Sequence, residues 1–157
     1  DIKYFYFYDD EDVFSNFYPC KFQDKDGFEY SSSEKYFMMA KAKFFKDDKI
    51  FQQIKSENDP EKIKDLGSQV ANFNLEEWKK VSKIIMTEGI LLKFQQNQEL
   101  KQFLLNTKDQ VIAEAAPSDL VWGIGMDKET AIKNNHQWKG QNLLGQCLMD
   151  VRKQLQQ

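Results

Sequence analysis

The sequence has little of the residue types on which metal centres and disulfide frameworks depend. It contains one histidine, His136, and two cysteines, Cys20 and Cys147, which lie far apart and outside any CxxC spacing. A histidine-rich or four-cysteine zinc site is therefore excluded, and we expect both thiols to be reduced and packed in or near a core. A Ser-His-Asp triad would need His136, and no GxSxG turn accompanies it. The sequence predicts neither a metal nor a cofactor.

A basic excess and long apolar runs are also missing. The net charge is −3, whereas proteins that bind nucleic acid tracts or membrane surfaces broadly usually carry a basic patch. No apolar run reaches membrane-spanning length, and the first residues lack the form of a signal peptide. We therefore expect a cytoplasmic protein, with the nucleus as an alternative, and no membrane partner.

What is present indicates a single α+β domain over residues 1–157. The chain is 41% hydrophobic and 14% aromatic, with 13 phenylalanines, which fits a globular protein with a sizeable core. Only three prolines and seven glycines interrupt it, so long loops should be few. Helical patterns dominate and the strands are short and scattered, which favours a mostly helical α+β fold over a doubly wound parallel sheet.

The expected elements follow from periodicity and capping residues. Helices are predicted over residues 32–45, 47–56, from Pro60 onward, 75–96, 98–107 and from Asn142 to the end. Strands are predicted over residues 3–8, 21–23, 28–30 and 111–115, with 119–125 as a strand or a loop. Ser31 and Glu34 show the spacing of a capping box before the first helix, and Asn142 is placed to cap the last.

Glu34 and Lys41 form the first candidate constellation. They are seven residues apart on one predicted helix, so both side chains emerge on the same face, roughly 10 Å apart along its axis. That span suits a sugar or a small ring, with Phe37 and Met38 as its floor. The alternative is a capping glutamate and an ordinary solvated lysine.

A second constellation is Asp119-x-x-Trp122-Gly123-x-Gly125. A carboxylate beside a tryptophan suits a general acid or base, and the glycines let the backbone approach a ligand. The alternative is a bulge with a core tryptophan and a capping aspartate. Asn142 marks a third candidate, because free N–H groups at a helix entrance favour phosphate; ordinary capping is its alternative.

Two further residues are ambiguous when taken alone. The amide of Asn16, set between aromatic residues, can read a ring edge or a sugar hydroxyl, or it can form a local Asx-turn. Trp78 lies on the apolar stripe of a long predicted helix, where a core role is the usual one.

Taken in order, these segments resemble the NADAR family, which includes riboflavin-intermediate N-glycosidases. The similarity covers about residues 5–155. The matching pieces are Phe14-Ser15-Asn16-Phe17, Ser33-Glu34-x-Tyr36-Phe37 with Lys41, Lys64-x-x-Gly67, Trp78 with Met86, Lys93-Phe94, Leu104-Leu105-x-Thr107, Glu114-Ala115 with Asp119-x-x-Trp122-Gly123-x-Gly125, and Gly140-x-Asn142-x-Leu144-Gly145 with Leu148-Met149-x-x-Arg152.

The resemblance implies hydrolysis of an N-glycosidic bond at ribose C1. Family substrates include phosphorylated pyrimidine intermediates of riboflavin synthesis, and other members are similar to hydrolases that remove ADP-ribose from guanine. The family's functional positions fall on Glu34, Trp78 and Asp119, and Lys41 matches a lysine that forms a Schiff base with the opened ribose. One departure is Ser68, where the family often has an arginine, which affects the expected affinity or substrate choice.

The residues and the resemblance together give one set of expected roles. The expected catalytic residues are Glu34, Asp119 and Lys41. The expected substrate-binding residues are Phe14, Ser15, Asn16, Tyr36, Phe37, Trp78, Trp122, Gly123, Gly125 and Asn142. The expected partner is a small nucleotide-like substrate, either a ribosylamine phosphate or ADP-ribose, with ADP-ribosylated nucleic acid as a further possibility. The alternative function is a non-catalytic ADP-ribose-binding module.

Overall fold

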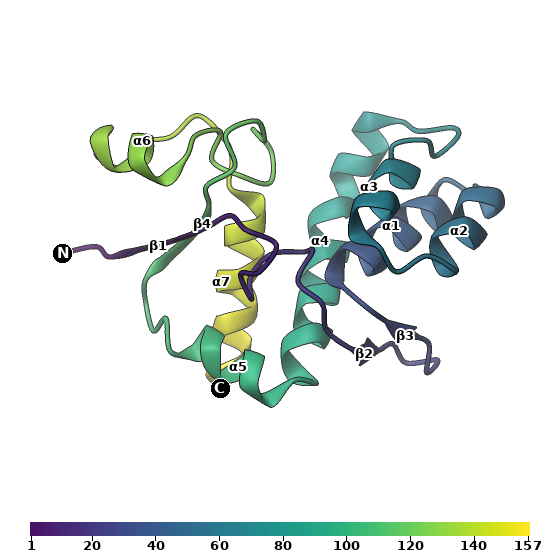
Figure 1. Cartoon of the computed structure of the whole chain (residues 1–157), viewed down its shortest axis with the longest axis horizontal. Coiled ribbons are helices and arrows are strands. Elements are labelled where there is room, and N and C mark those ends of the chain that lie inside the picture. The colour runs from purple at the N-terminus through teal and green to yellow at the C-terminus, as the bar shows by residue number, and fades with distance from the viewer. The chain divides into compact units, whose positions relative to one another are not determined.

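The computed structural model describes all residues from 1 to 157, and its chain divides into two compact units (Figure 1). One, here called the helical unit, contains residues 16–97; the other, the terminal unit, contains residues 1–15 and 98–157. Seven helices and four short strands confirm the predicted, mostly helical α+β class. A single domain over the whole chain stays a prediction. None of the helices combines the length and the apolar character that crossing a bilayer requires.

The helical unit consists of a short hairpin and four helices. Its elements are β2 (Phe22–Gln23), β3 (Glu29–Tyr30), α1 (Ser33–Phe44), α2 (Asp48–Lys55), α3 (Pro60–Gly67) and α4 (Leu75–Gln95). Helix α1 packs against α2, α3 and α4. The side chains of Asp47, Asp59 and Asn74 cap α2, α3 and α4 by accepting backbone N–H groups of their first turns.

The cap of α1 differs from the prediction by one residue. The Ser32 hydroxyl, not that of Ser31, accepts the N–H of Lys35 at 3.1 Å, whereas Ser31 donates its hydroxyl to Asn58. Adjacent serines are both chemically competent caps, and Ser32, whose backbone is extended, takes the role here. Glu34 therefore occupies the second helical position, so the predicted capping box is wrong.

Close helix approach in this unit depends on two glycines. A Cβ on Gly67 of α3 would collide with Met38 Sδ of α1, and a Cβ on Gly89 of α4 would overlap the Tyr36 ring. The buried Lys35 adds a polar link, because its Nζ donates to the carbonyls of Lys55 and Glu57, 2.8 Å away in each case, at the end of α2. Helix α1 is thus held on several sides.

The terminal unit pairs its two strands in parallel. Its elements are β1 (Tyr4–Phe7), α5 (Gln98–Leu105), β4 (Val111–Glu114), α6 (Lys128–Lys133) and α7 (Leu143–Leu155). Strand β1 pairs with β4, with Tyr4 opposite Val111 and Phe7 opposite Glu114; α7 lies against β4, as the yellow helix in Figure 1 shows. Helix α6 was not predicted because six residues are too few to show a helical period, and residues 119–125 form a loop rather than a strand.

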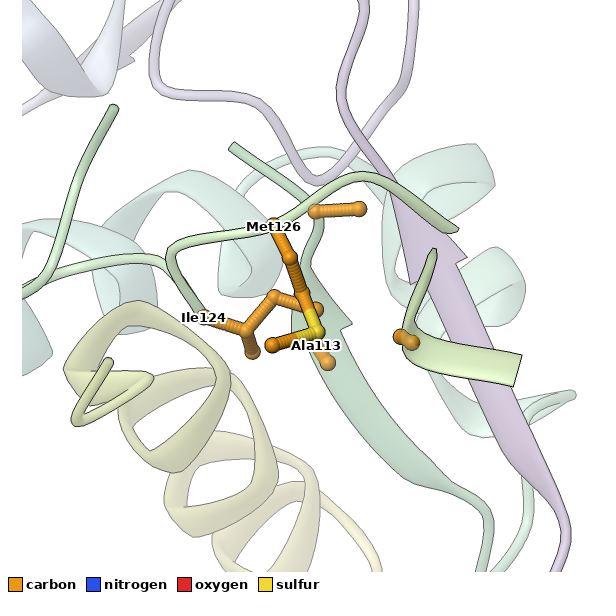
Figure 2. Packing of buried hydrophobic residues seen from close by; sticks show 5 residues of the cluster. Ala113, Ile124 and Met126 are labelled. Atoms are coloured by element: carbon orange, nitrogen blue, oxygen red, sulfur yellow. The ribbon is translucent and has the colours of Figure 1, made fainter. Parts of the chain in front are cut away.

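The terminal unit has a small buried cluster where this loop meets β4. It consists of Ala113, Ala115, Ile124, Met126 and Ala131, of which Figure 2 labels Ala113, Ile124 and Met126. The alanines leave room for Ile124 and Met126 to reach the strand.

At the far end of α7, Arg152 Nη1 donates to Thr107 Oγ1 at 2.9 Å and to the carbonyl of Gln110 at 2.8 Å. Thr107 and Arg152, two of the residues that carry the family resemblance, are thus structural partners.

Candidate functional site

Glu34 and Lys41 lie at opposite ends of α1 in the helical unit. Glu34 is buried, with 8% of its surface exposed, in the first turn, and Lys41 is half-buried near the last turn. Burial lowers the pKa of the Lys41 amine, while the Glu34 carboxylate opposes this by raising it. The two groups are therefore electrostatically coupled, as side chains on one helix face should be.

The Lys41 amine is held by two groups from outside its own helix. Its Nζ donates to the carbonyl oxygen of Gly67 at 2.9 Å and lies 4.7 Å from the centre of the Phe73 ring. The amine is thus held between the end of α3 and an aromatic face. A lysine whose pKa is lowered by burial has a larger unprotonated fraction at neutral pH, which suits a nucleophile. Phe73 directly precedes Asn74, the N-cap residue of α4. An aromatic residue just before a helix cap is the sequence signal that could have identified Phe73.

Asn16 fixes the start of α1 instead of forming a local turn. Its backbone carbonyl accepts the N–H of Glu34 at 3.0 Å, and its Oδ1 accepts the hydroxyl of Ser33 at 2.8 Å. Its Nδ2 points at Met86 Sδ, 3.5 Å away. Asn16 therefore positions the backbone that carries Glu34, and direct contact of its amide with substrate stays a prediction.

The remaining predicted residues of the helical unit are packed mainly among aromatic rings. Trp78 is only 7% exposed and contacts the rings of Phe37, Phe44 and Phe45, at 5.2 to 6.0 Å between ring centres. Tyr36 packs edge-on against Tyr30, and burial raises its pKa to about 12. Trp78 thus offers little open surface, and stacking of a substrate on it stays a prediction.

In the terminal unit, only one of the two carboxylate oxygens of Asp119 accepts hydrogen bonds from the protein. Its Oδ1 accepts the backbone N–H groups of Val121 at 3.0 Å and Trp122 at 2.8 Å, which matches the capping alternative. Its Oδ2 makes no hydrogen bond to the protein. The capped loop therefore orients a half-buried carboxylate whose second oxygen can serve a ligand.

The start of α7 does not present the free N–H groups predicted for phosphate. The N–H groups of Leu143 and Leu144 donate to the carbonyls of Val121 and Trp122, both at 3.1 Å. Gly140 and Asn142 likewise donate their N–H groups, to the carbonyls of Ile124 and Gly123. The chain's own loop therefore occupies these donors, and phosphate binding at this helix entrance stays a prediction.

Asn142 also does not cap α7 through its side chain. Its backbone is left-handed, with φ of 54°, and no side-chain cap bond forms. Instead its Nδ2 donates to the carbonyl of Ile112 at 3.0 Å and its Oδ1 accepts the N–H of Glu114 at 3.1 Å. The predicted N-cap position is confirmed, but the side chain links α7 to β4 instead of forming the cap bond. Its role as a substrate ligand stays a prediction.

Glycines 123 and 125 serve the chain's own packing. A Cβ on Gly123 would press on Ala116 and on the carbonyls of Glu114 and Asp119, and Gly125 has a φ of +76° beside Leu120. These contacts explain why a loop bearing Asp119 and Trp122 needs glycine, whereas their contact with substrate stays a prediction.

Phe14 and Ser15 lie inside the terminal unit. The Phe14 ring is almost fully buried among the rings of Phe5, Phe7 and Phe103, which is a core environment, and Ser15 is also buried. Their substrate contacts stay predictions. No group of three or more His, Cys, Asp or Glu side chains is arranged to hold a metal ion.

The sequence is similar to those of known proteins over most of its length. The NADAR domain matches residues 4–156. N-glycosidase R617 of Acanthamoeba polyphaga mimivirus is 41% identical over 150 residues, which cover 92% of this chain and 88% of that protein. N-glycosidase YbiA of Escherichia coli strain K12 is 32% identical over 149 residues, covering 94% of this chain and 83% of its own.

A solved structure agrees with the sequence match. The NMR structure of the E. coli protein YbiA has a TM-score of 0.80 to this chain at 29% identity, over 98% of this chain and 85% of that one. The resemblance inferred from the motifs is thereby confirmed. The chain belongs to the NADAR domain family.

Proposed function

We propose that the chain is an N-glycosidase that hydrolyses the bond between ribose C1 and the nitrogen of a base. The observation that supports this most directly is a buried carboxylate, Glu34, electrostatically coupled to an amine, Lys41, whose pKa is lowered by burial. The names of two relatives, N-glycosidase R617 and N-glycosidase YbiA, indicate the same reaction class.

Two carboxylates would divide the acid–base work. Breaking a ribosyl C–N bond develops positive charge at C1 and the ring oxygen, which a nearby carboxylate stabilises, while a second carboxyl group protonates the leaving nitrogen or activates water. Glu34 and Asp119 are the proposed pair. Glu34 belongs to the helical unit and Asp119 to the terminal unit. The Oδ2 of Asp119, which makes no hydrogen bond to the protein, supports the proposed role of that carboxylate.

Lys41 offers a covalent route to the same products. In a ribosylamine whose ring has opened to the imine, the unprotonated Nζ adds to C1 and the base leaves as its amine, so one C–N bond forms as the other breaks. Water then adds to the enzyme imine, and the sugar leaves as the aldehyde while the lysine amine is regenerated. The 2.9 Å bond to Gly67 limits the motion of the amine, which supports this route.

The proposed substrates are small nucleotide-like molecules. A ribosylaminopyrimidine phosphate is favoured, and ADP-ribosylated guanine is the second candidate of the same reaction class. The net charge of −3 mildly disfavours long nucleic acid tracts. A cytoplasmic or nuclear location is part of the proposal, and the absence of a disulfide at the two cysteines fits a reducing compartment.

A product assay tests the proposal. The protein is incubated separately with a ribosylaminopyrimidine phosphate and with ADP-ribosylated guanosine, and released ribose 5-phosphate or ADP-ribose is measured by mass spectrometry. Release from either substrate supports an N-glycosidase and identifies the better leaving group. Absence of both products at high enzyme concentration contradicts it.

The second candidate function is a non-catalytic ADP-ribose-binding module. The structural linking role of Asn142 and the packing roles of Gly123 and Gly125 would serve a binding protein equally well. Thermal stabilisation by ADP-ribose without turnover of either substrate would favour it. The buried Glu34 and the available oxygen of Asp119 favour the enzyme, because binding alone does not require two acids.

A further inference from the structure

Two exposed aromatic side chains lie close to Lys41, one near it in space and one near it in the sequence. Phe44 is 39% exposed and Phe73 is 43% exposed. Phe44 lies three residues after Lys41 on α1, and the Phe73 ring centre is 4.7 Å from Lys41 Nζ. A single exposed ring needs no explanation, but Phe73 lies next to a half-buried amine, and both Phe73 and Phe44 pack against the same inner ring, Phe45.

These rings are the outer layer of an aromatic cluster. Phe45 and Trp78 form the inner layer, with 9% and 7% of their surfaces exposed. Phe45 lies 4.9 Å from Phe44 and 5.3 Å from Phe73 between ring centres, and Trp78 lies 6.0 Å from Phe44. The inner layer already fills the interior, so the outer two rings keep open surface that the core does not use.

We propose that Phe44 and Phe73 form an aromatic rim that stacks the planar base of the substrate. This inference rests on the proposed function, in which Lys41 reaches the sugar carbon. The base is bonded directly to that carbon, so the surface that holds the base must begin within about one ring's width of the amine. Phe73 meets this condition. Trp78, the ring favoured from the sequence, lies behind the rim with little surface to offer.

The chemical class of the ligand follows from the surface. Stacking on phenylalanine is tolerant of base identity, because every base has a π face, and contributes about 1–3 kcal/mol per base. The rim therefore selects a planar heteroaromatic leaving group over an aliphatic amine but does not choose between a pyrimidine and a purine. A preference between bases must come from polar groups elsewhere.

The test compares Phe44→Leu and Phe73→Leu with Tyr8→Leu. Leucine keeps an apolar side chain and removes the ring, and Tyr8 is an exposed ring, 57% open, in the terminal unit. Binding of guanosine is measured by isothermal titration, and trapping of Lys41 by ribose 5-phosphate with borohydride is measured by mass spectrometry. We expect each rim variant to weaken guanosine binding by about 5- to 150-fold. Tyr8→Leu should leave guanosine binding unchanged.

The trapping reaction separates this inference from the proposed function. Ribose 5-phosphate has no base, so its trapping on Lys41 should be the same in the rim variants and the wild type. Unchanged guanosine binding in both rim variants, no binding by the wild type, or an equal loss of trapping and binding would overturn the rim. Ring-dependent guanosine binding in a protein that neither turns over an N-riboside nor traps the sugar would retain the rim and contradict the proposed glycosidase.

Discussion

The carbonyl oxygen of Gly67 accepts a 2.9 Å hydrogen bond from Lys41 Nζ. Gly67 can approach α1 this closely because it lacks a side chain, since a Cβ there would collide with Met38 Sδ. One glycine therefore serves both helix packing and the placement of an amine. The packing of α3 on α1 and the position of the proposed nucleophile, Lys41, therefore depend on the same residue.

The first prediction concerns the reactivity of Lys41. Because burial lowers its pKa below the ordinary 10.5, the unprotonated fraction should rise with pH and saturate at a lower pH than for a surface lysine. Borohydride trapping with ribose 5-phosphate should follow this profile, and Lys41→Arg should form no adduct. Exposed Lys43 on the same helix is the internal comparison. An adduct on Lys43 equal to that on Lys41 would contradict the assignment.

The second prediction concerns Gly67. Gly67→Ala places a methyl group against Met38 and should destabilise the fold by about 1–3 kcal/mol, the usual cost of overpacking. Gly67→Ala should cost less in a Met38→Ala background, because that background lacks the atom in conflict. Urea unfolding of the two single variants and the double variant gives the coupling energy. Strictly additive losses would show that the two residues do not meet.

The third prediction concerns the buried Lys93, whose pKa burial lowers from 10.5 to about 8. Below pH 8 both folded and unfolded chains hold the proton, so the cost of burying the charge is fully present. Between pH 8 and 10.5 the unfolded chain binds more protons, so stability should rise with pH relative to Lys93→Met. The gain should be on the order of 1–3 kcal/mol.

This pH effect is measured in a Cys20→Ser background. Burial raises the pKa of the Cys20 thiol while Lys93 lowers it, so the thiol would otherwise titrate in the same window. Chemical denaturation at several pH values gives the free energy of unfolding for each variant. A stability difference between lysine and methionine that is constant from pH 8 to 10.5 would contradict the assigned cause.

Much of the helical architecture could be predicted because local signals determine it. Three helices have a capping residue directly before their apolar repeat: Asp47 for α2, Asp59 followed by Pro60 for α3, and Asn74 for α4. Each of these helices begins at the next residue. Such signals locate a helix start only to within about one residue. Ser31 and Ser32 are both suitable caps in the sequence, and the structure uses Ser32.

The sites could be predicted less well, because long-range contacts override local chemistry. Asn142 has a side chain suited to capping a helix. Both its amide oxygen and its amide nitrogen instead form hydrogen bonds with β4, with residues 28 and 30 positions earlier in the chain. The N–H groups at the start of α7 are likewise consumed by a loop some 20 residues earlier. Nothing near Lys41 in the sequence indicates Gly67 or Phe73, because other helices bring them there.

The most direct test of the central claim is the turnover of Glu34→Gln beside Glu76→Gln, a control on an exposed glutamate of α4. Both variants should fold, as judged by circular dichroism. On whichever N-riboside the wild type hydrolyses, Glu34→Gln should lose roughly 10²–10⁴ in rate, whereas Glu76→Gln should match the wild type. Full activity in folded Glu34→Gln would contradict acid–base hydrolysis by this carboxylate.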